Sequence, residues 1–357
     1  MNYLCAISLV LMTFTVTANS FANENKTYDE QTHSIALDEL VIGGTLTLPT
    51  QPKSNALVIM ISGSGPQDRD ETLFGFKVFK IIAAHLGEKG IASFRFDDRG
   101  EGESTGDFTQ TTLNDHVSDI NAIINYFKSS SPNRYETFIL LGHSQGGIVS
   151  GKVARKNYNV KKLILMAAPS VPIIDLVLYQ VRQELIDQGL NHGLIEREVS
   201  AHHKLMHALV EGEKVAQSIA LFYDTAKLLQ LAQQPLDATQ LESIALDKTE
   251  TFKTIYQLPS LTSFLYYDPA NDYEKLTIPV LALFGGNDMQ VTIAQNKDKM
   301  ERALLNARTP YQFVTFDDAN HFFQQAQTVQ KQEYEALDKQ FVVGFLDELS
   351  NWILKGL

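Results

Sequence analysis

A serine between two glycines is the first feature of this sequence that predicts chemistry. Residues 142–146 read Gly-His-Ser-Gln-Gly and match the pattern G-x-S-x-G. They follow a short apolar stretch, 138–141, and precede a helix-like stretch, 146–156. The pattern is informative in that context, because a tight turn between strand and helix presents the serine hydroxyl at the edge of a sheet. We therefore predict that Ser144 is a nucleophile.

Ser144 needs a base, because a serine hydroxyl is a poor nucleophile at its own pKa. His321 is the strongest candidate among the nine histidines, since it follows the predicted strand 312–316 in a loop. Active sites of open α/β sheets collect at the carboxyl ends of strands. His143 is discounted, because such a turn points adjacent side chains apart. The alternative is an ordinary loop histidine at 321, which would leave Ser144 without an activator.

The base in turn needs a carboxylate that holds its tautomer and stabilises the imidazolium. Asp288 follows the predicted strand 280–284 and so lies at the same edge of the sheet. The order serine, aspartate, histidine along the chain is the one found with this kind of turn. Asp317 and Asp318 are rivals because they lie close to His321 in sequence, but they are better placed to shape its loop.

The oxyanion that forms on attack needs hydrogen-bond donors placed in advance. The amide of Gln145 is the first candidate, because it follows the nucleophile. The second is expected in residues 62–66, Ser-Gly-Ser-Gly-Pro, which follow the predicted strand 56–61. We predict the amide of Ser64, with that of Gly65 as the alternative.

A second glycine-rich segment, 96–104, follows another predicted strand but does not fit a phosphate loop. Its spacing differs from G-x-G-x-x-G, no lysine is placed for phosphate, and its acidic residues would repel an anion. We expect it to be a scaffold held by charged pairs.

Two further groups of residues are expected to be structural. Three histidines lie close together at positions 202, 203 and 207. His203 and His207 would share a helix face, but no Glu or Cys pattern surrounds them, so we predict no metal site. Three aromatic residues, Phe264, Tyr266 and Tyr267, are expected to pack in the core unless their region forms a lid over a pocket.

The remaining sequence alternates strand-like and helix-like runs, which predicts an α/β fold with a mostly parallel sheet covered by helices. Further predicted strands span 91–96 and 163–167, and a hairpin of 32–37 and 45–48 is expected to turn at Gly43-Gly44. Further predicted helices span 74–88, 113–127, 293–305 and 341–354. Residues 171–277 lack this alternation and are helix-rich. We therefore predict a core of residues 23–170 and 278–357, interrupted by a helical cap at 171–277.

Charge and the first residues constrain partners and location. The chain of 357 residues has a formal net charge of −12, which argues against nucleic acid or anionic lipid as a main partner. Residues 4–16 are almost wholly apolar and a small-x-small site follows at 20–22, so residues 1–22 are predicted to be a signal peptide. The alternative is an uncleaved anchor. We expect an exported, periplasmic or extracellular protein with no stable membrane insertion once the leader is removed. Its only cysteine, Cys5, lies in the leader.

Together these residues resemble the α/β-hydrolase superfamily, and in particular the bacterial esterase-like and serine-aminopeptidase-like hydrolases. The resemblance rests on the segments 62–70, 96–104, 142–147, 266–269, 278–291 and 320–323. It implies an eight-stranded α/β-hydrolase sheet with a cap. One departure is Ser62, where many relatives carry a histidine.

The resemblance implies a serine hydrolase that cleaves carboxylic esters of small molecules and needs no cofactor. Amides and thioesters are alternative substrates of the same fold. A peptidase is the first rival, and a non-catalytic binding module is the second.

Overall fold

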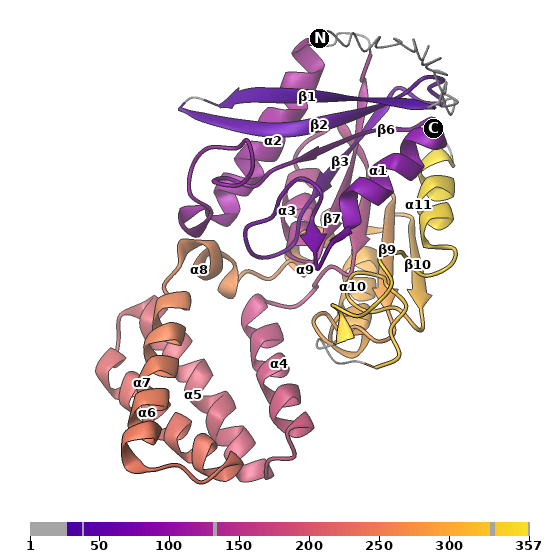
Figure 1. Ribbon diagram of the computed structural model, residues 1–357. Helices are drawn as coiled ribbons and strands as arrows, with labels where there is room; N and C mark the ends of the chain where they lie inside the picture. The colour runs from indigo at the N-terminus through magenta and orange to yellow at the C-terminus, as the bar shows by residue number, and fades with distance from the viewer. Residues whose placement is uncertain (1–26, 38, 131–133, 329–332, 356–357) are drawn as a thin grey trace, which may run out of the picture.

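The structure is a computed structural model that describes residues 27–37, 39–130, 134–328 and 333–355. The predicted signal peptide, 1–22, lies outside the described residues. Figure 1 shows a sheet with helices on both sides and a separate group of helices beyond one end of the sheet. No helix within the described ranges has both the length and the apolar character needed to cross a bilayer.

Eight strands form the main sheet in the order β1-β2-β6-β3-β7-β8-β9-β10. Their bounds are β1 (Tyr28–Leu37), β2 (Leu40–Pro49), β3 (Ala56–Ile61), β6 (Ala92–Phe96), β7 (Thr137–His143), β8 (Val160–Met166), β9 (Val280–Gly285) and β10 (Tyr311–Phe316). Strand β2 pairs antiparallel with β1 and β6, and all pairs from β6 to β10 are parallel. The predicted mostly parallel sheet is confirmed.

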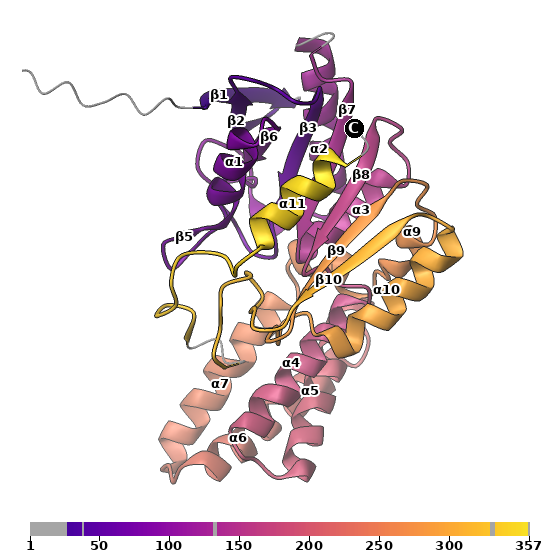
Figure 2. The same ribbon diagram turned by 90° about the vertical axis from the view of Figure 1, so that its right-hand side faces the viewer.

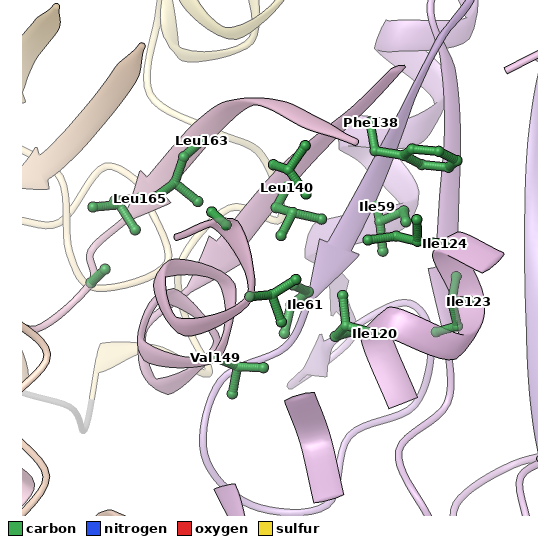
Figure 3. Packing of buried hydrophobic residues seen from close by; sticks show 14 of the residues in the cluster. Ile59, Ile61, Ile120, Ile123, Ile124, Phe138, Leu140, Val149, Leu163 and Leu165 are labelled. Carbon is green, nitrogen blue, oxygen red and sulfur yellow. The ribbon is translucent and has the colours of Figure 1, made fainter. Parts of the chain in front are cut away.

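Helices cover both faces of this sheet because its central strands are apolar on both sides. Alternate residues of β3 face opposite layers. Leu57, Ile59 and Ile61 pack toward α2 (Leu113–Ser130) and α3 (Gln145–Ala154). Ala56, Val58 and Met60 pack toward α1 (Val78–Glu88) and α11 (Phe345–Leu354). Figure 3 shows the first of these layers, and Figure 2 shows α11 on the opposite side of the sheet from α10 (Ile293–Ala307).

The position of the first turn was predicted wrongly. Gly43 and Gly44 lie inside β2, and the chain turns between Leu37 and Leu40. A Cβ on Gly44 would overlap the ring of Phe94 on the neighbouring strand, and one on Gly43 would overlap Glu103. Glycine is required there by close packing against β6 and the loop that follows it, not by a turn.

A small hairpin replaces the predicted first turn of helix α1. Strands β4 (Thr72–Leu73) and β5 (Phe76–Lys77) pair antiparallel, and α1 begins only at Val78. Phe74 and Gly75, at φ +46° and +83°, form the turn between them. The hairpin lies at the edge where the parallel strands end, and its residues Leu73 and Phe74 line the cavity described below.

The structure describes every residue of 171–277, and the regular elements of this segment are all helices, as predicted. They are α4 (Ile173–Asp187), α5 (His192–Glu211), α6 (Val215–Gln233), α7 (Ala238–Ile255), α8 (Pro259–Leu265) and α9 (Ala270–Tyr273). Side chains start two of them: Asn191 caps α5, and Asp237 forms a capping box at α7. Helices α4–α7 pack into a bundle with hydrophobic clusters of its own, beyond the carboxyl ends of β9 and β10 (Figure 1). Their role as a cap stays a prediction.

Candidate active site

Ser144 lies in the turn between β7 and α3 with a backbone conformation that is rare outside glycine, φ +50° and ψ −121°. Such strain is held by its surroundings and is common at functional sites. A Cβ on Gly146 would overlap the carbonyl of Ile61, and one on Gly142 would overlap the carbonyl of Gly146. Gly146 is therefore required for the turn to pack against the end of β3, and Gly142 is required for the turn to close on itself.

His321 and Asp288 are in direct contact. Nδ1 of His321 lies 2.8 Å from Oδ2 of Asp288, and each residue is 3% exposed. The other carboxylate oxygen of Asp288 accepts the amides of Gln290 at 2.7 Å and Val291 at 2.9 Å. Because the carboxylate can only accept, Nδ1 carries the proton and Nε2 is free to act as a base.

Burial lowers the pKa of His321 below its usual value, and Asp288 opposes that shift without cancelling it. The ring is therefore neutral at neutral pH, as a base requires. The rivals Asp317 and Asp318 are exposed and take no part in this contact.

Ser144 and His321 line one cavity of about 350 Å³, with Asp288 behind the histidine. Its lining residues are Gly63, Ser64, Gln67, Glu71, Leu73, Phe74, His143, Ser144, Gln290, His321, Phe322 and Tyr334. Most come from the loop after β3, the β4–β5 hairpin and the loop after β10. None comes from 171–277, and the insertion approaches the cavity through Gln180 of α4, which donates to the carbonyl of Gln290 at 3.0 Å.

The structure places the two predicted oxyanion donors, Ser64 and Gln145, differently. Ser64 lines the cavity, whereas Gln145 begins α3 and borders a much smaller neighbouring void. Within the described ranges, neither amide donates a hydrogen bond to another protein atom. The amide of Gly63, by contrast, already donates to Oε1 of Glu71 at 2.8 Å. The amides of Ser64 and Gln145 therefore have no protein acceptor among the described residues, and their role stays a prediction.

Ser62, the departure from many relatives, anchors the start of this loop. Its hydroxyl donates to the carboxyl of Asp98 at 3.1 Å, and the amide of Gln67 donates to the same group at 3.0 Å. Burial raises the pKa of Asp98 to about 8. One buried carboxyl therefore joins both ends of the loop that carries Ser64.

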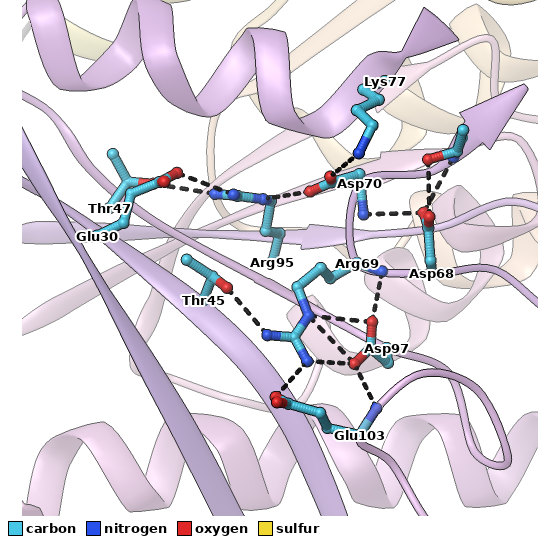
Figure 4. Close-up of polar contacts among 11 residues, drawn as sticks. Glu30, Thr45, Thr47, Asp68, Arg69, Asp70, Lys77, Arg95, Asp97 and Glu103 are labelled. Atoms are coloured by element: carbon cyan, nitrogen blue, oxygen red, sulfur yellow. Dashed lines mark hydrogen bonds and ion pairs between the residues drawn. The ribbon is translucent and has the colours of Figure 1, made fainter. Parts of the chain in front are cut away.

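The segment 96–104 forms the charged scaffold that the sequence predicts (Figure 4). Arg69 pairs with Asp97 and with Glu103, the latter at 2.7 Å. Beside it, the buried Arg95 pairs with Asp70 at 2.8 Å. These pairs fix Arg69 and Asp70, which lead from the Ser64 loop into the β4–β5 hairpin.

A second acid–imidazole pair lies next to the first and was missed by sequence reasoning. Oε1 of Glu71 lies 2.7 Å from Nδ1 of His143, and both residues are 1% exposed. Nε2 of His143 lies 3.1 Å from the carbonyl oxygen of His321. The motif contains His143, but no local signal pairs it with a glutamate 72 positions earlier.

None of the other described residues singled out in the sequence lines the cavity. His202 is buried, with Nδ1 2.6 Å from the hydroxyl of Tyr256. The rings of His203 and His207 lie 6.3 Å apart, and the described part of the chain holds no cluster of three or more residues arranged to bind a metal. The aromatic residues Phe264, Tyr266 and Tyr267 do not line the cavity.

Residues 76–322 match the family described as serine aminopeptidase, S33. The chain belongs to this family. The matched range contains Ser144, Asp288 and His321, but the loop that carries Ser64 precedes it.

Two curated relatives are esterases by name. The chain is 25% identical to Esterase EstD of Thermotoga maritima over 316 residues, which cover 87% of this chain and 65% of that protein. It is 32% identical to protein phosphatase methylesterase 1 of Candida albicans over 115 residues, 32% of this chain and 28% of that protein. The chain thus spans less than two thirds of the length of either relative.

Solved structures share the fold. An esterase of Pyrococcus furiosus matches with a TM-score of 0.54 and 13% identity, over 91% of this chain and 90% of that one. Proline iminopeptidase of Mycobacterium smegmatis matches with a TM-score of 0.52 and 16% identity, over 90% and 100%. The protein has the α/β-hydrolase fold.

Proposed function

We propose that this protein is a serine hydrolase that cleaves carboxylic esters through an acyl-enzyme intermediate, with Ser144, Asp288 and His321 as its catalytic triad. The observation that carries the proposal is the buried His321–Asp288 hydrogen bond, formed at a cavity that also exposes the strained Ser144. The family and the two named esterases support the same reaction class.

In the first step, Nε2 of His321 accepts the hydroxyl proton while Oγ of Ser144 attacks the ester carbonyl. The amides of Ser64 and Gln145 stabilise the oxyanion, and Asp288 stabilises the imidazolium. The C–O bond to the alcohol then breaks, and the alcohol leaves with the proton from His321. In the second step, a water molecule activated by His321 attacks the acyl-enzyme and releases the acid.

The cavity fits a small, largely apolar substrate. Leu73, Phe74, Phe322 and Tyr334 supply apolar surface, and none of the described lining residues is a lysine or arginine that would hold an anionic group. Its volume of about 350 Å³ lies at the lower end of the range of small-molecule sites. We infer uncharged short-chain or aromatic esters as the substrate class.

Cleavage of aminoacyl amides is the second candidate, because of the family and of one carboxylate in the cavity wall. Oε2 of Glu71 has no hydrogen-bond partner among the described residues, but it is buried, so a substrate ammonium group would have to displace part of the wall to reach it. Oε1 already accepts Gly63 and lies beside His143, so Glu71 is less free than a dedicated ammonium site.

The test uses residues 23–357 with p-nitrophenyl acetate and butyrate beside aminoacyl p-nitroanilides with a free amino group. Rapid hydrolysis of the esters that is lost in Ser144→Ala is the expected result. Faster turnover of the anilides would assign the peptidase reaction instead. No hydrolysis of either set and no reaction with a fluorophosphonate would favour a binding module.

We also propose that residues 171–277 form a cap that controls access to the cavity. The support is the position of α4–α7 beyond the carboxyl ends of the strands and the contact from Gln180 to Gln290 (Figure 1).

We also propose that the predicted leader, residues 1–22, directs export of the protein. Cells that express the full chain should be fractionated, and the mass of the protein in each fraction should show whether the leader has been removed.

A further inference from the structure

His143 has hydrogen-bond partners that define its charge. Nδ1 faces a carboxylate oxygen of Glu71 at 2.7 Å, and Nε2 faces the carbonyl oxygen of His321 at 3.1 Å. A carbonyl oxygen and an ionised carboxylate can only accept, so both ring nitrogens must donate. His143 is therefore an imidazolium paired with the Glu71 carboxylate.

The electrostatics agree with this assignment. Burial by itself lowers the pKa of His143, but the Glu71 carboxylate outweighs burial and raises the pKa above its usual value. Oε2 of Glu71 has no hydrogen-bond partner among the described residues, so the contacts of Oε1 with His143 and Gly63 hold the pair in place.

The same carboxylate oxygen holds the loop that carries the oxyanion donor. Oε1 of Glu71 accepts the amide of Gly63, the residue before Ser64, at 2.8 Å. A Cβ on Gly63 would lie 3.3 Å from Cβ of Ser144 and 3.4 Å from Nδ1 of His143. Gly63 is thus closely packed against both the nucleophile and the ion pair.

Glu71 is itself held in an unusual backbone conformation by its neighbours. Its φ of +48° is rare for a residue with a side chain, and its amide donates to the carbonyl of Asp68 at 2.9 Å. The preceding residue, Asp70, is fixed by Arg95 and Lys77 (Figure 4). The surrounding contacts therefore hold a strained backbone conformation at Glu71, where this residue lines the cavity.

We propose that the Glu71–His143 ion pair is a positioning device for catalysis, which rests on the proposed function. It joins three segments that must stay in register: the loop that presents the Ser64 amide, the turn that presents Ser144, and the loop that presents His321. Neither residue takes part in the proton transfers. The pair sets the distance between nucleophile, base and oxyanion donor, and small errors in that geometry are costly.

Glu71→Gln and His143→Asn test this inference, because they keep similar size but remove the charge. With p-nitrophenyl butyrate and kcat normalised to fluorophosphonate-titrated sites, we expect kcat to fall about 10- to 100-fold in each variant. KM should change less than about 2-fold, because a positioning residue contributes chiefly to the transition state. The double variant should lose about as much as either single variant, since the two residues act as one unit.

Glu198→Gln is the matched control. Glu198 is also 1% exposed, is also close to a buried histidine, His202, and lies in the insertion. It should leave kcat unchanged. An unchanged kcat in Glu71→Gln, a rise in KM alone, or an equal loss in Glu198→Gln would overturn the inference. An additive double variant would also overturn it.

The proposed function is tested separately by the wild-type protein. If wild type neither hydrolyses esters nor reacts with the fluorophosphonate, the function fails. If wild type is active and Glu71→Gln is equally active per titrated site, only the positioning role fails. Titration of sites keeps partial misfolding from imitating a lower kcat.

Discussion

Two buried pairs of a glutamate and a histidine lie in different parts of this molecule and have different surroundings. At the cavity, Glu71 and His143 contact Gly63 and the backbone of His321. In the insertion, Glu198 and His202 lie 3.2 Å apart, and their other partners are Lys248 and Tyr256.

The two pairs differ in their other hydrogen-bond partners. His202 meets a tyrosine hydroxyl, which can either donate or accept a hydrogen bond. His143 meets only acceptors and must be charged. Burial and pairing are common to both and do not by themselves indicate function. A positioning pair differs from a structural pair in the segments that its remaining hydrogen bonds connect.

The largest expected effect concerns the carboxylate behind His321. Asp288→Asn should lower kcat about 10⁴-fold, because the amide favours the wrong tautomer of the imidazole. Asp317→Asn and Asp318→Asn are the controls, and we expect both to keep wild-type rates. Comparable losses at position 317 or 318 would move the acid of the triad to the loop itself.

The pH dependence should show that His321 is the base. Its pKa is lowered, so kcat/KM for an uncharged ester should rise with pH through an inflection below the usual value of about 6.5 and then level off. The value of kcat/KM falls at low pH because His321 is then protonated and cannot accept the serine proton. An inflection well above that value, measured on wild type, would indicate another group as the base.

A smaller effect is expected from the aromatic residue at the tip of the β4–β5 hairpin. Phe74 lines the cavity and is 55% exposed, so Phe74→Ala should raise KM for p-nitrophenyl butyrate about 3- to 10-fold and change kcat little. Tyr266, 43% exposed in the insertion, is the matched control. A larger KM effect for Tyr266→Ala would show that the insertion, rather than the hairpin, forms the binding surface.

The smallest effect on activity is expected inside the insertion. Glu198→Gln removes the partner of Lys248 and should lower the free energy of unfolding by about 1–3 kcal/mol, measured by urea denaturation. Ester hydrolysis at 25 °C should stay at the wild-type rate. A loss of activity in Glu198→Gln at a temperature where the variant is fully folded would contradict this prediction. It would show that the Glu198–His202 pair also influences the cavity.

Sequence reasoning located Ser144, Asp288 and His321 because each follows an apolar strand, and parallel strands end at one edge. The helical character of 171–277 was also predictable from composition and spacing. Both depend on local patterns, and local patterns are what a single sequence contains.

The parts that were missed depend on contacts between distant segments. Glu71 meets His143 only in the folded chain, and its positive φ has no sequence signature. The two-residue strands β4 and β5 are too short to show alternation. Gly43 and Gly44 are explained by close contacts with Glu103, in the loop after β6, and with Phe94 of β6. Neither contact is visible in the local sequence, where two adjacent glycines look like a turn.

The central claim, that Ser144 forms the covalent intermediate, is tested most directly by locating the adduct. Incubation of residues 23–357 with a fluorophosphonate, followed by digestion and mass spectrometry of the peptides, should find one phosphonylated residue, Ser144. The same treatment of Asp288→Asn should label that residue far more slowly. A stoichiometric adduct on any other side chain, or labelling that persists in Ser144→Ala, would contradict the assignment.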